Sequence, residues 1–175
     1  MNERRQYAPK RAVSGIRIRH YRIEDRPFVV HCLVESQQYI SSIDNFSLCI
    51  LRKRYGENMM EMLISGLREG GCILIAEIQG KNVGMISASV HNPSALEVIE
   101  MASIKRGVIT ELFVEADYRG KGVAIRLIEE AERWLKSNYC QLSFLNVLSG
   151  NGRAHSLYSH LGYKEYELIM MKRLS

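Results

Sequence analysis

The spacing of apolar side chains predicts a strand and then two helices in the first part of the chain. Residues 16–21 alternate apolar and polar side chains, which is typical of a half-buried strand. A helix is predicted next, with Asp25 as its cap and Pro27 in its first turn, because apolar or small residues then recur at helical spacing. Methionine and leucine side chains predict a second amphipathic helix over 59–67, which the glycines at 70–71 end.

The rest of the chain predicts a sheet with helices between its strands. Residues 72–78 and 83–90 are rich in β-forming side chains and are joined by a glycine-containing turn, so they predict an antiparallel hairpin. Three further strands are predicted over 107–114, 142–148 and 164–173. Helices are predicted over 123–135, where the apolar spacing is most regular, and over 151–161. This order predicts a mixed sheet with helices on its faces.

Length and composition fit one domain that stays outside the membrane. The chain has 175 residues, of which 46% are hydrophobic. We expect a single domain over 16–175, after a basic and disordered tail over 1–15. No apolar stretch approaches the roughly 20 residues that span a bilayer, and the first residues lack the apolar segment of a secretory signal. The cytoplasm is therefore the expected compartment.

The placement of charges and cysteines argues against two other classes of protein. The net charge of +5 arises within residues 1–20, where six basic side chains meet one acidic side chain, while the remaining 18 basic and 18 acidic side chains cancel. A nucleic-acid binder is therefore disfavoured, although such a tail suits an acidic surface. The four cysteines are far apart and form no CxxC pair, so we expect buried thiols, with neither a disulfide scaffold nor a metal site.

A basic, glycine-rich turn gives the clearest indication of a ligand. The strand over 107–114 leads into Arg119-Gly120-Lys121-Gly122, and a helix follows at once. Unpaired N–H groups already make a helix N-terminus positive, so basic side chains there cost stability unless an anion binds. Glycine lets the backbone approach that anion closely. The turn therefore indicates a phosphate-bearing ligand, and the alternative is a basic turn that only faces solvent.

The common phosphate-binding loops do not fit this turn, but a different family signature does. No GxxxxGK loop followed by Ser or Thr is present, and Ile125 stands where a dinucleotide loop needs its third glycine. Residues 119–124 match R/Q-x-x-G-x-G/A, and residues 151–163 match N-x-x-A-x-x-L-Y-x-x-x-G-F/Y. In both motifs, in their order and in their spacing, the chain resembles the GNAT superfamily of acetyl-coenzyme A dependent N-acetyltransferases.

The resemblance covers roughly residues 16–173 and implies both a fold and a cosubstrate. The implied fold is α/β (α+β), with a mixed, mostly antiparallel central sheet of six or seven strands flanked by about four helices. Ala116 departs from the family, which often has proline there; this loosens the loop but removes no ligand group. The implied cosubstrate is acetyl-coenzyme A, with no metal.

The resemblance also implies which residues hold coenzyme A. Its pyrophosphate is expected on the N–H groups of the turn and the helix start, and Arg119 is expected to add charge. The pantetheine arm is expected to pair with backbone groups at Phe113 and Val114, and Asn151 is expected near that arm, although a helix N-cap is an equally good interpretation of Asn151. The implied set in the turn is Arg119, Gly120, Lys121, Gly122, Val123 and Ala124.

Two residues are the catalytic candidates. Tyr158 lies in the second motif, and a phenol with a pKa near 10 can donate a proton to a departing thiolate with a pKa near 8.5. Core packing is the alternative role for this ring. Glu111 lies in an otherwise apolar strand and is a candidate for the base that takes a proton from the amine. A salt bridge to an arginine of the sheet is an equally good interpretation of Glu111.

Other side chains are weaker candidates for chemistry. Glu77, Glu97 and Glu100 are the remaining acidic candidates for a base. Cys140 has no partnered histidine or aspartate at a recognisable spacing, so an acylated thiol is disfavoured. His155 and His160 are five residues apart and therefore do not share a helical face as zinc ligands would.

The leading hypothesis is an enzyme that moves the acetyl group of acetyl-coenzyme A to a primary amine by direct attack. The alternative is a non-catalytic coenzyme A binding or sensor module of the same fold. Fold analogy does not name the amine, and the sequence leaves a homodimer open. We expect acceptor specificity to reside in residues 24–70 and 91–107, which include the two segments, 41–55 and 94–106, without a clear helical or strand pattern.

Overall fold

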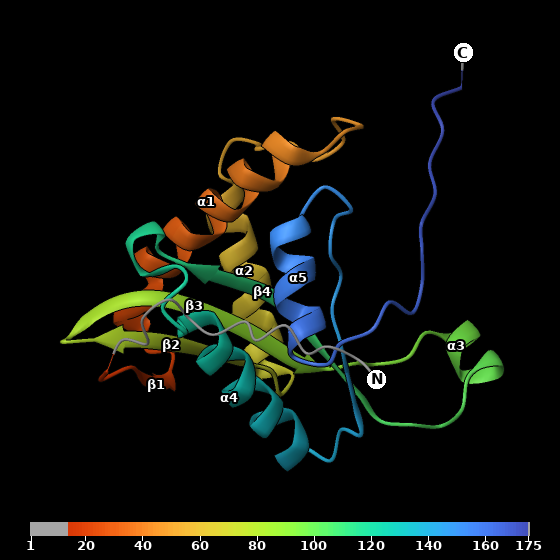
Figure 1. Ribbon diagram of the computed structural model, residues 1–175. Coiled ribbons are helices and arrows are strands. Elements are labelled where there is room, and N and C mark those ends of the chain that lie inside the picture. Colours follow the sequence, from red (N-terminus) through yellow and green to blue (C-terminus); the bar gives the residue numbers. More distant parts are fainter. Residues whose placement is uncertain (1–13, 175) are drawn as a thin grey trace, which may run out of the picture.

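A five-stranded sheet lies between two layers of helices in the computed structural model, which describes residues 14–174 (Figure 1). The strands are β1 (Arg17–His20), β2 (Cys72–Ile78), β3 (Lys81–Val90), β4 (Arg106–Val114) and β5 (Leu142–Phe144). The helices are α1 (Arg26–Ile43), α2 (Tyr55–Arg68), α3 (Ala95–Glu100), α4 (Val123–Ser137) and α5 (Gly152–His160). Short 3-10 turns precede α1 at Ile23–Asp25 and α4 at Ala116–Tyr118. The basic tail expected over 1–15 falls almost entirely outside the described residues.

The sheet is mixed and mostly antiparallel, as predicted. Its strands follow the order β1-β2-β3-β4-β5, in which the first four pair antiparallel and β5 runs parallel to β4. The expected six or seven strands are not confirmed, because residues 14–174 contain five. The strand expected over 142–148 pairs only as far as Phe144, and residues 164–173 are extended but bond to no neighbouring strand. A strand pattern in the sequence shows that a segment favours an extended conformation. The segment becomes part of a sheet only where a neighbouring strand is available for main-chain hydrogen bonds.

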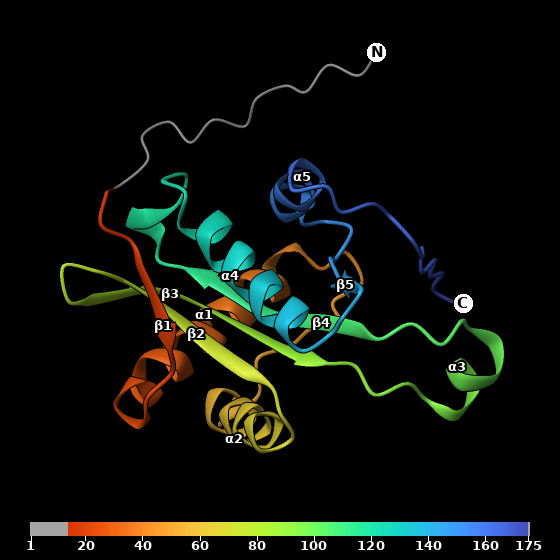
Figure 2. The same cartoon turned by 90° about the horizontal axis from the view of Figure 1, so that it is seen from below.

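The two faces of the sheet carry different helices (Figure 2). On β2, Ile73 and Ile75 pack in a core with α1 and α2, whereas Leu74 and Ala76 pack in a second core with α4. This alternation follows from the period of two along a strand. Both faces are therefore buried, and the site residues of β4 lie between two packed layers.

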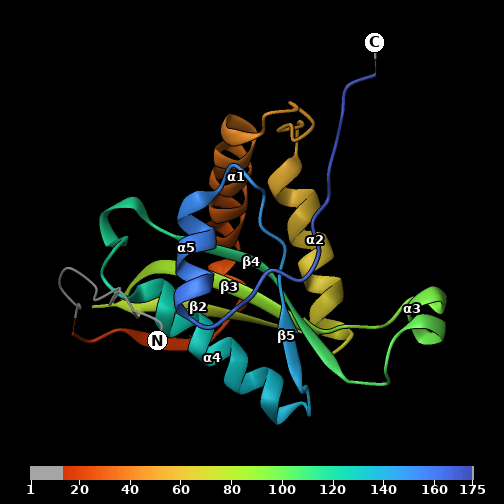
Figure 3. The ribbon, with the colours of Figure 1, turned by 45° about the vertical axis from the view of Figure 1, so that its right-hand side comes forward.

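Helix α3 forms within a segment whose sequence has no clear pattern. Ser94 caps it, accepting a hydrogen bond from the N–H of Glu97, while the Glu97 carboxylate accepts one from the N–H of Ser94. The short helix projects beyond the ends of β3 and β4 (Figure 3). With it, the described part of the chain holds five helices, against the four or so expected.

Asp25 occupies the N-cap position of α1, as predicted, but its side chain makes no capping hydrogen bond. Its carboxylate instead accepts two hydrogen bonds from the Arg19 guanidinium at 2.6 and 2.8 Å, one from the N–H of Arg22 and one from the Asn82 amide. Arg19 also pairs with Glu77, at 3.0 Å. This buried network ties β1 to the β2–β3 hairpin and to the start of α1. Arg19 and Arg22 are close to Asp25 in the chain, but a local capping rule could not foresee Asn82, which is 57 residues away.

A bulge in β4 decides which way its acidic side chain points. Ser87 pairs with Glu111 and Ala88 pairs with Ile109, so Thr110 is an extra residue, and its hydroxyl lies 2.7 Å from that of Ser87. A one-residue slip moves every later side chain to the other face. Ile109 accordingly packs in the α4 core, whereas Phe113 packs in the α1–α2 core. Glu111 has the strand phase of Phe113.

Candidate active site

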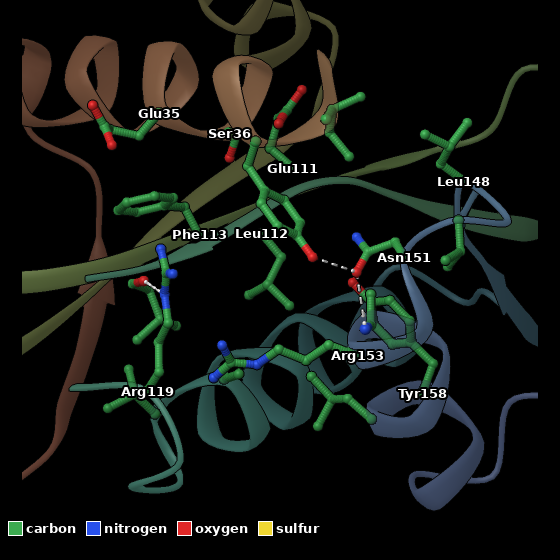
Figure 4. A pocket seen from close by; sticks show the side chains of 18 of the residues that line it. Glu35, Ser36, Glu111, Leu112, Phe113, Arg119, Leu148, Asn151, Arg153 and Tyr158 are labelled. Atoms are coloured by element: carbon green, nitrogen blue, oxygen red, sulfur yellow. Dashed lines mark hydrogen bonds between the residues drawn. The ribbon is translucent and has the colours of Figure 1, made fainter. Parts of the chain in front are cut away.

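A cleft opens where β5 parts from β4. Its volume is about 380 Å³, and its walls come from β4, the turn before α4, residues 146–148, α5 and one side of α1. Figure 4 shows these side chains converging from the different elements. Every residue of the expected site lines this cleft except Lys121, whose ammonium lies 5.4 Å from the centre of the Tyr118 ring. The fold thus gathers residues as far apart in the sequence as Glu111 and Tyr158, which come from a β-strand and a helix, around one turn.

The edge of β4 that faces the cleft is open over most of its length. β5 pairs with β4 only from Arg106 to Val108, so no strand within residues 14–174 covers this edge from Ile109 to Val114. An extended ligand can add to such an edge as a further strand, through main-chain hydrogen bonds. Arg119 already donates from its Nε to the carbonyl of Val114, at 2.8 Å. The same contact holds the guanidinium beside the ring of Phe113.

The turn before α4 has the features of an anion site. Gly120 and Gly122 have φ angles of 72° and 89°, and a Cβ built on either would meet no atom within 4 Å. Gly122 occupies the N-cap position, so no side chain caps α4, and its first turn holds no acidic residue. The first N–H groups of the helix therefore keep their hydrogen-bonding capacity, beside open space.

Arg153 is a cleft residue that the sequence analysis did not single out. It lies in the first turn of α5 and lines the cleft, and Figure 4 shows its side chain extending toward the end that holds Arg119. Among residues 14–174, no carboxylate forms an ion pair with it. A signal was present in the sequence, because a basic side chain at a helix start is the same anomaly that marks Arg119 and Lys121.

Helices α1 and α2 also contribute a wall that motif analysis missed. The cleft-lining side chains from this layer are Glu35, Ser36, Gln37, Tyr39, Ile40 and Tyr55. The loop between the two helices was unassigned from the sequence. In the structure Asp44 orders it by accepting hydrogen bonds from the N–H groups of Phe46, Leu48 and Cys49.

Glu111 is half-buried in the cleft wall. Burial raises the pKa of its carboxyl group to about 7, because the charged form loses hydration. In the described part of the chain no hydrogen bond or salt bridge to this carboxylate is found, so the arginine partner considered from the sequence is not present there. A carboxyl group with a pKa near 7 can accept a proton at neutral pH and release it again.

Tyr158 enters the same cleft from α5. Burial raises the pKa of its phenol to about 12, and the negative charge of Glu111 adds to the shift. The ring makes an edge contact with Tyr163, with the ring centres 5.7 Å apart. The hydroxyl group therefore stays protonated at neutral pH, and it is available as a donor.

Asn151 has the capping role considered for it. Its side-chain oxygen accepts a hydrogen bond from the N–H of Ala154 at 3.1 Å and another, longer one from the Tyr39 hydroxyl at 3.5 Å. The N-cap interpretation is therefore confirmed. Because Asn151 also lines the cleft, its cap fixes the start of α5 against α1 at the cleft wall.

The weaker candidates lie elsewhere. Glu77 pairs with Arg19, and Glu97 caps α3 while binding Arg106 at 2.6 Å. Cys140 is buried, and burial raises the pKa of its thiol, which disfavours the reactive thiolate. Within residues 14–174, no group of three or more His, Cys, Asp or Glu side chains is placed to hold a metal, and no helix has the length and apolar character needed to cross a membrane.

Relatives in two archaea are named N-acetyltransferases. An uncharacterized N-acetyltransferase of Methanocaldococcus jannaschii is 30% identical over 112 residues, which are 61% of this chain and 47% of that protein. One of Archaeoglobus fulgidus is 32% identical over 108 residues, covering 62% of this chain and 69% of that protein. The matched part is thus about half of the first relative's length.

Comparison with solved structures supports the fold. The structure of AAC(6')-Iy in complex with a bisubstrate analog, CoA-S-monomethyl-acetylneamine, has a TM-score of 0.64 and 18% sequence identity, and the match covers 93% of this chain and 99% of that one. At this identity the similarity concerns the fold alone. A sequence model of the acetyltransferase (GNAT) family matches residues 40–163, a stretch that includes β4, the glycine turn and α5. The chain therefore belongs to the acetyltransferase (GNAT) family.

Proposed function

We propose that this chain transfers the acetyl group of acetyl-coenzyme A to a primary amine by direct attack. The observation that carries the proposal is the meeting of an unpaired carboxyl group, Glu111, and a protonated phenol, Tyr158, in one cleft that ends on an anion-binding turn. GNAT proteins use acetyl-coenzyme A as cosubstrate, and the cleft supplies groups for each part of that molecule.

The proposed binding follows the length of the cleft. The N–H groups at Gly120, Gly122 and the start of α4 receive the pyrophosphate, with charge from Arg119 and Arg153. The open edge of β4 at Phe113 and Val114 pairs with the amides of the pantetheine arm, as an added strand would. The thioester then lies beyond Val114, toward Glu111 and Tyr158.

The proposed chemistry assigns one proton to each catalytic residue. An alkylammonium group with a pKa of about 10.4 is almost fully protonated at pH 7, so the amine must first lose a proton. Glu111 takes that proton, directly or through water, and the freed amine forms the new C–N bond. Tyr158 donates its proton to the sulfur as the C–S bond breaks, and the proton released by the attacking nitrogen restores the phenol. The products are the amide and coenzyme A.

The first test is an acceptor screen that follows thiol release. Aminoglycosides, polyamines, amino acids and peptide N-termini cover the main classes of primary amine. Release that requires one of these classes supports the transferase. Binding of acetyl-coenzyme A without release for any amine would instead favour the non-catalytic binding module.

The role of Tyr158 is tested by Tyr158→Phe in single-turnover experiments with the acceptor found. The substitution keeps the ring and removes the hydroxyl, so we expect the rate to fall by roughly 10²–10⁴ with little change in acetyl-coenzyme A affinity. Tyr163→Phe is the matched control, because that ring packs on Tyr158 while its hydroxyl binds Glu132 and Ser143 outside the cleft. An unchanged rate in Tyr158→Phe would remove the phenol from the mechanism.

A further inference from the structure

The charged side chains that line the cleft are separated across its width. Among residues 14–174 its basic side chains are Arg119 and Arg153, and Figure 4 shows both on the side of α4 and α5. Its acidic side chains are Glu35 and Glu111, and the same view places both on the side of α1. Coenzyme A is an anion and suits the basic side. The acidic side is therefore left for the second substrate, which receives the acetyl group.

One face of α1 forms most of this acidic side. Four of the α1 residues that line the cleft follow the helical spacing i, i+1, i+4 and i+5, which places them on one face; they are Glu35, Ser36, Tyr39 and Ile40. Glu35 is exposed, and in the described part of the chain its carboxylate forms no ion pair or hydrogen bond. This carboxylate is therefore free to bind a cation that comes from solution.

Two phenol rings accompany Glu111 in the cleft. Tyr55, at the start of α2, lines the same cleft; burial raises the pKa of its hydroxyl, and the negative charge of Glu111 adds to the shift. The charge of Glu111 acts in the same direction on Tyr158, from α5. A carboxylate together with aromatic rings favours a bound ammonium group. This end of the cleft therefore suits the amine that reacts.

The rest of the acidic side favours an aliphatic ligand over a sugar. The Gln37 amide already donates to the carbonyl of Ile50 at 3.0 Å, and the Tyr39 hydroxyl donates to Asn151 at 3.5 Å. Ile40 adds apolar surface to the same wall. Few polar partners remain here for the many hydroxyl groups of a sugar, whereas a chain of methylene groups needs none.

We propose that the acceptor is an aliphatic diamine or polyamine, whose reacting ammonium group binds at Glu111 and whose second ammonium group binds at Glu35. This inference rests on the proposed acetyl transfer. An acceptor with a carboxylate in place of the second ammonium group is disfavoured, because that carboxylate would meet Glu35 and find no arginine on its side of the cleft. Ser36, which Figure 4 shows between the two glutamates, has a small side chain that leaves room for the methylene groups. Glu35 is thus a specificity residue and takes no part in the chemistry.

The test compares acceptors that share a four-carbon chain and differ at its far end, namely 1,4-diaminobutane, butylamine and 4-aminobutanoate. In the unaltered chain, the KM of the diamine should be about 10-fold lower than that of butylamine, because its second ammonium group adds a charge-assisted hydrogen bond. Glu35→Gln should remove this difference and leave kcat and the KM of acetyl-coenzyme A unchanged. Glu35→Lys should make 4-aminobutanoate a better acceptor than the diamine.

Glu61→Gln is the matched control. The Glu61 side chain is 68% exposed on α2 and does not line the cleft, so this variant loses the same charge and should keep the preference for the diamine. Both Glu35 variants should keep the circular dichroism and melting temperature of the unaltered chain, because Glu35 has no partner to lose among residues 14–174.

A binding measurement separates this inference from the proposed acetyl transfer. Calorimetry with 1,4-diaminobutane and the protein saturated with coenzyme A needs no turnover. Binding that weakens about 10-fold in Glu35→Gln, without thiol release for any amine, would support the diamine site and overturn the transferase. Thiol release with equal KM values for the diamine and butylamine, or release with an aminoglycoside or an amino acid but not with the diamine, would overturn the diamine site alone. Neither binding nor release would overturn both.

Discussion

Asp25 and Glu111 are both carboxyl groups withdrawn from water, yet their acidities move in opposite directions. Asp25 is 5% exposed and accepts hydrogen bonds from Arg19, Arg22 and Asn82, and these partners lower its pKa to about 2. Glu111 is also withdrawn from water but has no such partner among residues 14–174, and burial raises its pKa to about 7. Burial alone raises the pKa of a carboxyl group, and at Asp25 the hydrogen-bond partners reverse that direction.

The difference separates a structural carboxylate from a chemical one. Asp25 is committed to holding β1, the β2–β3 hairpin and α1 together, and a proton would have to displace its hydrogen bonds. Glu111 keeps the cost of its burial uncompensated, which leaves it ready to bind a proton at neutral pH. Substitution of Glu111 should therefore change catalysis, and substitution of Asp25 should change stability.

The largest effect is expected from Glu111→Gln on catalysis. If Glu111 is the base, the turnover rate at pH 8 should fall by roughly 10²–10⁴. The unaltered enzyme should also become faster as the pH rises through about 7, because only the ionised carboxylate accepts a proton; this limb should disappear in the variant. The measurement is a pH–rate profile of both proteins under saturating acetyl-coenzyme A. A profile that keeps its limb in Glu111→Gln would assign that limb to another group.

Asp25→Ala should instead act on stability. It removes one member of a buried ion pair and leaves Arg19 with Glu77 as its carboxylate partner, besides hydrogen bonds to Asn82 and to the His20 carbonyl, so the free energy of unfolding should fall by about 3–5 kcal/mol. Urea unfolding followed by circular dichroism measures this change. The result would contradict the comparison if Asp25→Ala unfolded at the same urea concentration as the unaltered chain.

The pH dependence of stability should show two separate windows. The folded pKa of Glu111 is raised above its unfolded value near 4.3, so its contribution is fully present below about pH 4 and is lost as the pH rises through 7. The folded pKa of Asp25 is lowered, so its contribution is present above about pH 4 and is lost as the pH falls toward 2. Between pH 5 and 8, the unaltered chain should therefore lose about 2 kcal/mol relative to Glu111→Gln. Parallel urea titrations of both proteins at the two pH values measure that difference.

The smallest effect is expected from an exposed carboxylate that has a partner but is not withdrawn from water. Glu57 pairs with Arg26 on the surface, at 2.7 Å, and Arg26 keeps Glu61 as a second partner. Glu57→Gln should shift the melting temperature by less than about 2 °C. Thermal melts of Glu57→Gln and Asp25→Ala, measured side by side, would show that losing an ion pair costs more stability when the pair is buried. A large shift would mean that pairing alone, without burial, explains the effect at Asp25.

The sequence predicted features whose causes are local. The glycine turn could be recognised because basic residues and the helix start are adjacent in the chain, and α4 because its apolar face repeats within one helix. The β2–β3 hairpin formed as predicted for the same reason. These elements can be predicted from the local sequence, without knowledge of residues distant in the chain.

Features with distant causes were missed or incomplete. The direction of Glu111 depends on the extra residue Thr110, which becomes visible only when β4 is paired with β3. The wall that α1 gives to the cleft depends on tertiary packing. Residues 164–173 have a strand pattern, but the pattern does not name the strand beside it. The sequence pattern predicts the conformation that a segment favours, and tertiary pairing determines whether the segment joins the sheet.

The parting of β4 and β5 has a consequence for heat resistance. From Ile109 to Val114, the open edge of β4 has main-chain groups that no strand pairs within residues 14–174. A ligand that pairs with this edge extends the sheet. Because it binds only the folded state, its binding free energy adds to the free energy of unfolding. At 100 times its dissociation constant, such a ligand adds about 2.7 kcal/mol to the free energy of unfolding. The free energy of unfolding should therefore be highest when the concentration of this ligand is high, and lowest when the ligand is depleted.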